Sequence, residues 1–249
     1  MDTPKDNFSE GSAQYKAFRP VYPKELYDAI LSRVSTSQRC WDCGTGNGQV
    51  AVALAPFFEE IQATDLSQSQ LDQAPNLPNV HYRSEQAEKA TFPDHYFDLI
   101  CVAQAAHWFH LELFEKVVSR VSKPGGLLAI WGYSLPRTGS PVDRLIDQYY
   151  KEVLGPFWDN ERRHIDQKYE HIRFSFQEET VVSDFYINVQ WSLEDLKGYL
   201  GTWSALRHYI KTTGLNPLPD LLLELQATWG PDAIRSFSFP LFLKLWRIE

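Results

Sequence analysis

The 249-residue sequence lacks an excess of positive charge: 24 lysines and arginines stand against 32 acidic residues, which gives a formal net charge of −8. Binding to a nucleic-acid backbone releases counterions through a basic surface, so this balance argues against an RNA or DNA partner. Long hydrophobic runs are also missing, and no stretch reaches the roughly 20 apolar residues of a membrane span. Residues 1–18 are polar and contain no apolar run of signal-peptide type. We therefore expect neither a nucleic-acid partner nor membrane insertion.

Cysteine is scarce, with only Cys40, Cys43 and Cys101. An odd number of cysteines without a secretory signal favours reduced thiols and a cytoplasmic location. Cys40 and Cys43 form a CxxC pair, but a redox pair belongs at a helix N-terminus and these two lie in a predicted strand. The seven histidines are scattered, and none stands at ligand spacing to a cysteine or an acid, so no metal site is expected.

Apolar and aromatic residues are abundant, at 43% and 14% of the chain, and charged residues make up 22%. This composition supports a sizeable core, and the eight tryptophans suggest an aromatic-lined pocket as well. The length allows one large domain, and we take residues 1–249 as a single domain.

Strand and helix patterns alternate through residue 133. Strands are predicted over 39–43, 61–66, 80–85, 97–104 and 127–133. Helices are predicted over 24–34, 49–57 and 111–122, the last ending at the breaker KPGG, and over a short segment capped by Ser67 and Gln70. Such alternation is typical of a parallel sheet with helices on both faces.

The alternation stops at residue 134. We interpret 134–180 as a helical insertion over the ligand edge of the sheet that shapes the substrate pocket, and 1–37 as an N-terminal cap segment. Beyond it, the pattern predicts a strand over 183–190, one helix over 191–210 capped by Ser192 and Asp195, and a last strand over 236–246. The fold class predicted is α/β, with a doubly wound, mostly parallel, seven-stranded sheet.

Three glycines, Gly44, Gly46 and Gly48, occupy alternate positions after Asp42 in the segment WDCGTGNGQ. They follow a predicted strand and precede a helix, at the turn where doubly wound folds bind nucleotides. Glycine allows positive φ and lets the backbone approach a ligand. A dinucleotide fingerprint needs its third glycine where Gln49 stands, which disfavours NAD, and no lysine follows the glycines as in a phosphate loop.

Asp65 follows Asp42 by 23 residues, at the end of the second predicted strand. An acid at that place suits two hydrogen bonds to ribose hydroxyls. The pattern acid-x-Gly-x-Gly-x-Gly with this second acid resembles the class I S-adenosylmethionine-dependent methyltransferases, and FPDHYFDLI and KPGGLLAIWGY resemble their later segments. The resemblance implies a Rossmann-like fold, S-adenosyl-L-methionine as cofactor and S-adenosyl-L-homocysteine as product.

Three further segments, YKAFRPVYP, QAAHWF and TWSALRHY, are similar to the type 11 or trans-aconitate methyltransferase-like subgroup, whose substrates are small molecules. The cofactor-binding residues that the resemblance implies are Tyr15, Arg19, Asp42, Gly44, Gly46, Gly48, Asp65, Leu66, Ala87, Glu88 and Gln104. The substrate-pocket residues that it implies are Tyr22, Trp108, Tyr133 and Trp203.

His107 and Arg19 are the candidate catalytic residues. A sulfonium methyl is already activated, so catalysis mainly requires in-line positioning of the acceptor. A carboxylate acceptor needs no base, whereas an amine or phenol would use one, and His107 is either that base or a wall residue. Arg19 can bind a carboxylate bidentately. We expect a small-molecule methyltransferase with a carboxylic acid as one candidate acceptor; the alternatives are a protein methyltransferase and a non-catalytic cofactor-binding regulator.

Overall fold

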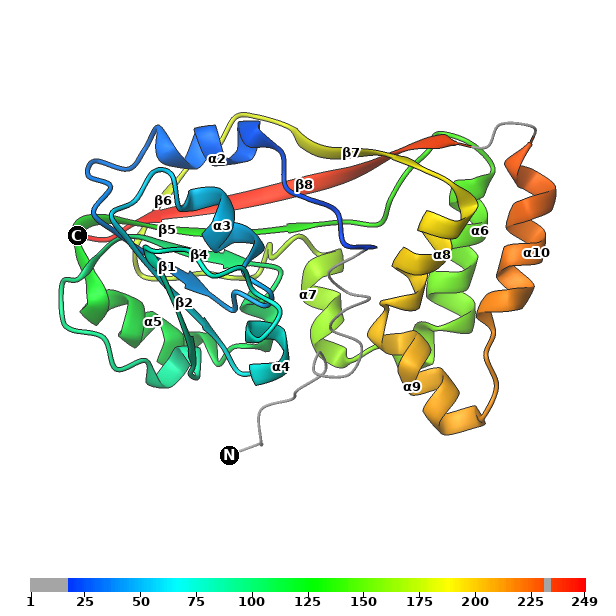
Figure 1. The fold of residues 1–249 in the computed structure, drawn as a ribbon, viewed down its shortest axis with the longest axis horizontal. Coiled ribbons are helices and arrows are strands. Elements are labelled where there is room, and N and C mark those ends of the chain that lie inside the picture. Colours follow the sequence, from blue (N-terminus) through cyan, green and yellow to red (C-terminus); the bar gives the residue numbers. More distant parts are fainter. Residues whose placement is uncertain (1–17, 231–233) are drawn as a thin grey trace.

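The computed structural model describes residues 18–230 and 234–249, whose strands form one eight-stranded sheet (Figure 1). The strands are β1 (Arg39–Cys43), β2 (Glu60–Asp65), β3 (Val80–Ser84), β4 (Phe97–Ala103), β5 (Ser122–Tyr133), β6 (Gln177–Glu179), β7 (Phe185–Trp191) and β8 (Arg235–Arg247). The order is β3-β2-β1-β4-β5-β8-β6, and β7 pairs with a different stretch of β8. The first five strands are parallel and β8 is antiparallel to β5, so the doubly wound, mostly parallel sheet is confirmed. The sheet has eight strands and not the predicted seven, because both β6 and β7 pair with β8.

Alternation of side chains along the buried strands gives the sheet two apolar faces. Leu99 and Cys101 of β4 belong to the core beneath α2 (Lys24–Leu31) and α3 (Gln49–Leu54). Ile100 and Val102 belong to the core beneath α5 (Leu111–Val121). Helices therefore cover both faces, as a parallel sheet requires.

The cap of α4 and the start of β5 each agree only in part with the prediction from the sequence. Of the capping box predicted for Ser67 and Gln70, the structure has one half: Ser67 accepts a hydrogen bond from the Gln70 N–H and caps α4 (Gln68–Leu71), whereas the Ser67 N–H donates to the Asp65 carboxylate. Strand β5, however, begins at Ser122, five residues before the predicted start at residue 127. The glycines of KPGG extend it because Gly125 N–H donates to the Ile248 carbonyl near the chain end.

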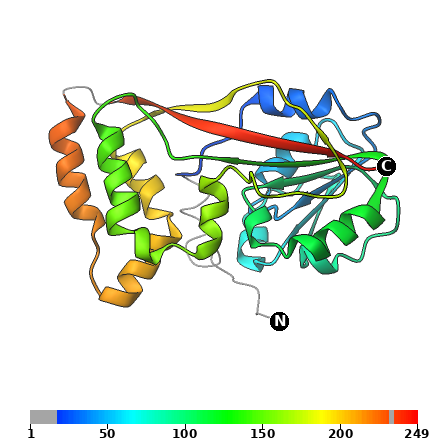
Figure 2. The same ribbon diagram turned by 180° about the vertical axis from the view of Figure 1, so that it is seen from behind.

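A second group of elements, which we call the helical cap, lies beyond the carboxyl ends of the parallel strands (Figure 1). It consists of α6 (Val142–Gln148), a π-helical turn (Tyr149–Val153), 3-10 turns (Gly155–Phe157 and Asn160–Arg162), α7 (Arg163–Asp166), α8 (Leu193–Gly201), α9 (Ser204–Thr213) and α10 (Leu218–Trp229). Figure 2 shows from behind that β7 and β8 run out from the sheet to this cap. Residues 134–180 thus supply helices and also β6, where no strand was expected.

The single helix predicted over 191–210 is wrong, because the chain breaks at Thr202 and Trp203. Trp203 is extended, with φ −70° and ψ 130°, and the Thr202 hydroxyl donates to the Tyr199 carbonyl. The break turns the Trp203 indole toward Tyr150 and Trp158, with ring centres 5.6 and 5.5 Å away. Aromatic packing therefore overrides the helical pattern. The capping box at the start of α8 is confirmed.

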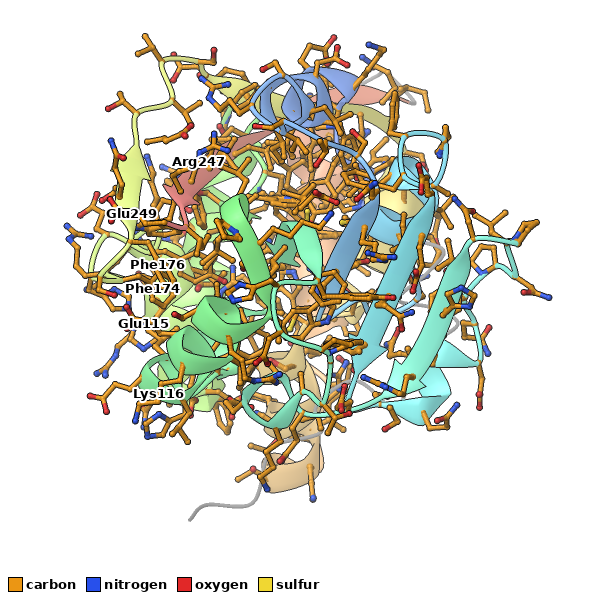
Figure 3. All side chains as sticks on the ribbon, turned by 90° about the vertical axis from the view of Figure 1, so that its left-hand side faces the viewer. Glu115, Lys116, Phe174, Phe176, Arg247 and Glu249 are labelled. Carbon is orange, nitrogen blue, oxygen red and sulfur yellow. The ribbon has the colours of Figure 1, made fainter. Side chains whose placement is uncertain are left out.

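After α7 the chain returns across α5 and the end of β8. The Ser175 N–H donates to the Glu115 carboxylate, and the ring of Phe174 lies 5.0 Å from Trp246. Figure 3 shows Phe174 and Phe176 beside Glu115 of α5. Across the described ranges, every helix is too short or too polar to traverse a lipid bilayer.

Candidate functional site

The loop between β1 and α3 has no room for side chains at two of its glycines. Gly44, Gly46 and Gly48 have φ values of 73°, 55° and 82°, in the left-handed region that favours glycine. A β-carbon at Gly44 would lie 2.5 Å from the β-carbon of Ala105, and one at Gly48 would lie 2.5 Å from the Tyr82 hydroxyl. Both the backbone conformation and the close neighbours therefore require glycine at positions 44 and 48.

Asp42 lies inside this turn and is fully buried. Its Oδ2 accepts hydrogen bonds from the Thr45 hydroxyl and the Ala51 N–H. Its Oδ1 is buried without a hydrogen-bond partner in the part of the chain that the structure describes. Burial raises the pKa of the carboxyl to about 7, although the bond from Thr45 opposes the shift. A buried oxygen with no partner fits an N–H-bearing group of a ligand.

Asp65 links the glycine loop to the end of β2. One carboxylate oxygen accepts from the Gly46 N–H at 2.8 Å, and the other accepts from the Ser67 N–H at 2.9 Å. Leu66 follows at the strand end, and 43% of its surface is exposed, although its side chain is large and apolar. Asp65 and Leu66 therefore lie at the end of β2, beside the glycine loop.

The exits of β3 and β4 complete this edge. Ala87 is buried, and the Glu88 carboxylate accepts from the His110 N–H at 2.7 Å. Gln104 follows β4 with φ 55°, and its N–H donates to the Trp131 carbonyl of β5. The chain leaves β1 toward β2, whereas β4 lies on the other side of β1, so the loop sits at the topological switch point where open α/β sheets bind ligands.

Arg19 joins the N-terminal segment to both the sheet and the helical cap. Its Nη1 donates to the Tyr133 hydroxyl at 2.7 Å, and its guanidinium carbon lies 5.6 Å from the centre of the Tyr199 ring. Tyr22 is 9% exposed and meets the Trp131 ring edge-on at 5.7 Å, so it packs in the core beside β5. Tyr15 lies outside the described residues.

His107 lies in the 3-10 turn Ala106–Trp108 that follows β4. Its Nδ1 is 2.8 Å from the Tyr169 hydroxyl oxygen, and its ring centre is 4.7 Å from that of Trp108. Burial lowers the pKa of the imidazole to about 3, and the positive charge of Arg162 adds to the shift. The imidazole is therefore neutral at physiological pH and is a weak base.

Trp203 forms the centre of an aromatic cluster in the helical cap. It is 3% exposed and lies within 6 Å of the rings of Tyr150, Trp158 and Tyr199. Arg162 lies on this cluster and was not anticipated, because nothing in NERRHID distinguishes it from Arg163. The predicted site residues within the described ranges thus fall into two neighbouring groups, one along the strand ends and one at the cap.

The described ranges, 18–230 and 234–249, contain no group of three histidine, cysteine or acidic side chains that could hold a metal ion.

Comparisons with known proteins agree with this geometry. The family model described as a methyltransferase domain matches residues 41–130, which include the glycine loop and β4. A protein of Dictyostelium discoideum with a provisional methyltransferase assignment is 35% identical over 98% of this chain and 95% of its own length. A Saccharomyces cerevisiae protein provisionally assigned as an S-adenosylmethionine-dependent methyltransferase is 26% identical over 62% of this chain and 57% of its own. A solved structure from Anaeromyxobacter dehalogenans, provisionally assigned as a type II methyltransferase, has 34% identity and a TM-score of 0.84, covering 92% of this chain and 98% of that one.

The fold, the glycine loop and these relatives define a transferase of methyl groups. The chain belongs to the class I S-adenosylmethionine-dependent methyltransferases, and its cofactor is S-adenosylmethionine.

Proposed function

We propose that this methyltransferase acts on a small molecule and that its acceptor is a carboxylic acid. The observation that carries the proposal is the half-buried His107, whose Nδ1 is bonded to Tyr169 and whose pKa is lowered to about 3. An amine or phenol acceptor loses a proton during transfer and gains from a competent base, whereas a carboxylate is already ionised at neutral pH. His107 is then a wall residue that Tyr169 orients, and not a base.

The cofactor residues follow from the fit of the loop. We assign Asp42 to the ammonium of the cofactor because its buried Oδ1 has no other partner in the described chain. We assign Asp65 to the ribose hydroxyls, since it stands at the end of β2 beside the loop. The remaining cofactor-binding residues that we assign are Tyr15, Arg19, Gly44, Gly46, Gly48, Leu66, Ala87, Glu88 and Gln104. S-adenosylmethionine supplies a methyl group that its sulfonium has already activated.

The helical cap favours a small acceptor over a folded protein. Arg19 contacts both Tyr133 of β5 and Tyr199 of α8, and the turn that holds His107 bonds to Tyr169 beyond α7. These contacts bring residues 134–180 and α8 over the strand ends, and we assign Trp108, Tyr133 and Trp203 to the acceptor side of the site. Positioning by such a cap supplies much of the rate in a reaction between two bound molecules.

Transfer of label tests the proposal. The protein is incubated with methyl-labelled S-adenosylmethionine and matched pairs of organic acids and their amides, with phenols and amines alongside. We expect label in methyl esters of an acid and none in the paired amide. The Asp65→Asn variant serves as a low-affinity control.

Three other results contradict it. Label on an amine or phenol would make His107 or another group a working base. Label on protein alone would favour a protein methyltransferase, and binding of cofactor without any transfer would favour a regulatory protein.

A further inference from the structure

We infer that Arg162 binds an anionic group of the acceptor, carboxylate or phosphate, and is the residue that selects acids over their neutral analogues. This inference rests on the proposed function and adds the residue responsible for its specificity.

Arg162 is held by one edge of its guanidinium only. Its Nε donates to the Tyr150 hydroxyl at 3.0 Å, and that hydroxyl donates to the Asp166 carboxylate at 2.8 Å. The guanidinium carbon lies 5.1 Å from the centre of the Trp158 ring and 5.6 Å from that of Tyr150. Tyr150, Asp166 and Trp158 therefore position the group without using its terminal nitrogens.

The terminal nitrogens Nη1 and Nη2 of Arg162 make no hydrogen bond to any residue in the described ranges, and 21% of the side chain is exposed. A guanidinium presents these donors as a planar fork that matches the two oxygens of a carboxylate or phosphate. Partial removal from water strengthens such a contact relative to a surface ion pair. An arginine with a purely structural role would use its Nη donors in hydrogen bonds to the cap, and Arg162 does not do so within the described ranges.

Arg162 lies near the acceptor side of the site. The turn Asn160–Arg162 contacts the turn Ala106–Trp108, which holds His107, and the guanidinium of Arg162 lies on the rings of Tyr150 and Trp158 that pack against Trp203. The positive charge of Arg162 also contributes to lowering the pKa of His107. His107 follows β4 and Trp203 belongs to the cap, so Arg162 stands between the strand end and the cap. Asp166 forms an ion pair with the Nε edge of Arg162 at 3.8 Å, so the Nη edge is the part of the guanidinium that is left for an anionic ligand.

Calorimetry on the full chain saturated with S-adenosylhomocysteine tests the inference. The probes are cinnamate, its neutral analogue cinnamamide, and phenyl phosphate. The variants are Arg162→Met and Arg162→Lys, with Arg163→Met as the matched control because the neighbouring Arg163 is exposed. Thermal unfolding of each variant reports whether it is folded.

We expect the wild type to bind at least one of the two anions and not cinnamamide. The Arg162→Met variant should lose at least about tenfold in anion affinity, the change that corresponds to 1.4 kcal/mol. Arg162→Lys should recover only part of the loss, because an ammonium lacks the fork. Arg163→Met should bind as the wild type does. A preference for cinnamate or for phenyl phosphate identifies which anion fits.

The inference is overturned if neither anion binds the wild-type complex, if cinnamamide binds equally well, or if Arg162→Met leaves anion affinity unchanged. It is also overturned if Arg162→Met weakens S-adenosylhomocysteine instead, since Arg162 would then serve the cofactor. Failure of the wild type to transfer label to any acid, with anion binding intact, would count against the proposed function and leave the role of Arg162 standing.

Discussion

The α-carbon of Gly44 faces Ala105 so closely that a β-carbon on Gly44 would lie 2.5 Å from that of Ala105. Gly44 begins the loop after β1, and Ala105 follows β4. The two strands are neighbours in the sheet although 53 or more residues separate their ends. This contact brings the two strand exits together at the switch point, and it forms without a side chain at position 44.

Gly44→Ala should therefore destabilise the protein more than Gly139→Ala. Both glycines have similar positive φ, 73° and 70°, and a side chain at such φ costs about 1–2 kcal/mol. Only Gly44 adds a collision, for which overpacking costs about 1–3 kcal/mol more, because nothing lies within 4 Å of a β-carbon at Gly139. Urea unfolding measures both variants. Equal losses of unfolding free energy would show that the loop yields around Ala105.

Asp65→Asn should weaken S-adenosylhomocysteine binding by about 1–3 kcal/mol, the range for a lost charge-assisted hydrogen bond. Isothermal calorimetry gives the affinity. Asp72→Asn is the matched control, since Asp72 is an exposed acid at the end of α4. Unchanged affinity in Asp65→Asn would remove this carboxylate from the ribose site.

Asp42 should make the cofactor-free protein less stable as pH rises from about 4 to about 7. The pKa of its carboxyl is raised to about 7 in the folded state, so over this window the folded protein keeps a proton that the unfolded chain has lost. The unfolding free energy then falls with pH by at most about 1.4 kcal/mol per unit, and the fall ends above pH 7. Asp42→Asn carries no titrating group and should lack this contribution. Parallel pH profiles for the two proteins would contradict the raised pKa.

His107 should contribute no ionisation to kcat/KM between pH 5 and 8, because burial lowers its pKa to about 3. At saturating cofactor, His107→Gln should change the magnitude of kcat/KM and leave the shape of its pH profile in this range unaltered. A limb with a midpoint between pH 6 and 7 that disappears in His107→Gln would make this histidine a base.

The sequence predicts the sheet well because its signals are local. Buried strands such as β1 and β4 are short apolar runs. The loop at Gly44 is predictable because its three glycines adopt the left-handed backbone conformation, which favours glycine. The cap is harder to predict. Trp203 interrupts a helical pattern because its ring packs against Tyr150 and Trp158, which lie elsewhere in the chain. Helix α10 is not among the predicted helices, although Pro219 in its first turn and Gly230 after its end are residues typical of helix boundaries.

Part of the site shares this difficulty. Arg162 lies in a run of charged residues, and only the distant hydroxyl of Tyr150 and the ring of Trp158 distinguish it from Arg163. The Tyr169 contact to His107 spans 62 residues, and no spacing rule relates the two. The contacts of Arg162 and Tyr169 depend on tertiary packing and cannot be identified from local pattern, whereas the glycine loop and the place of Asp65 at the end of β2 can.

A crystal structure with S-adenosylhomocysteine tests the central claim most directly. The account predicts its ribose hydroxyls within hydrogen-bond distance of the Asp65 carboxylate and its amino group beside Asp42, over the glycine loop. A ligand seated elsewhere in the protein, or one whose ribose lies away from Asp65, would contradict it.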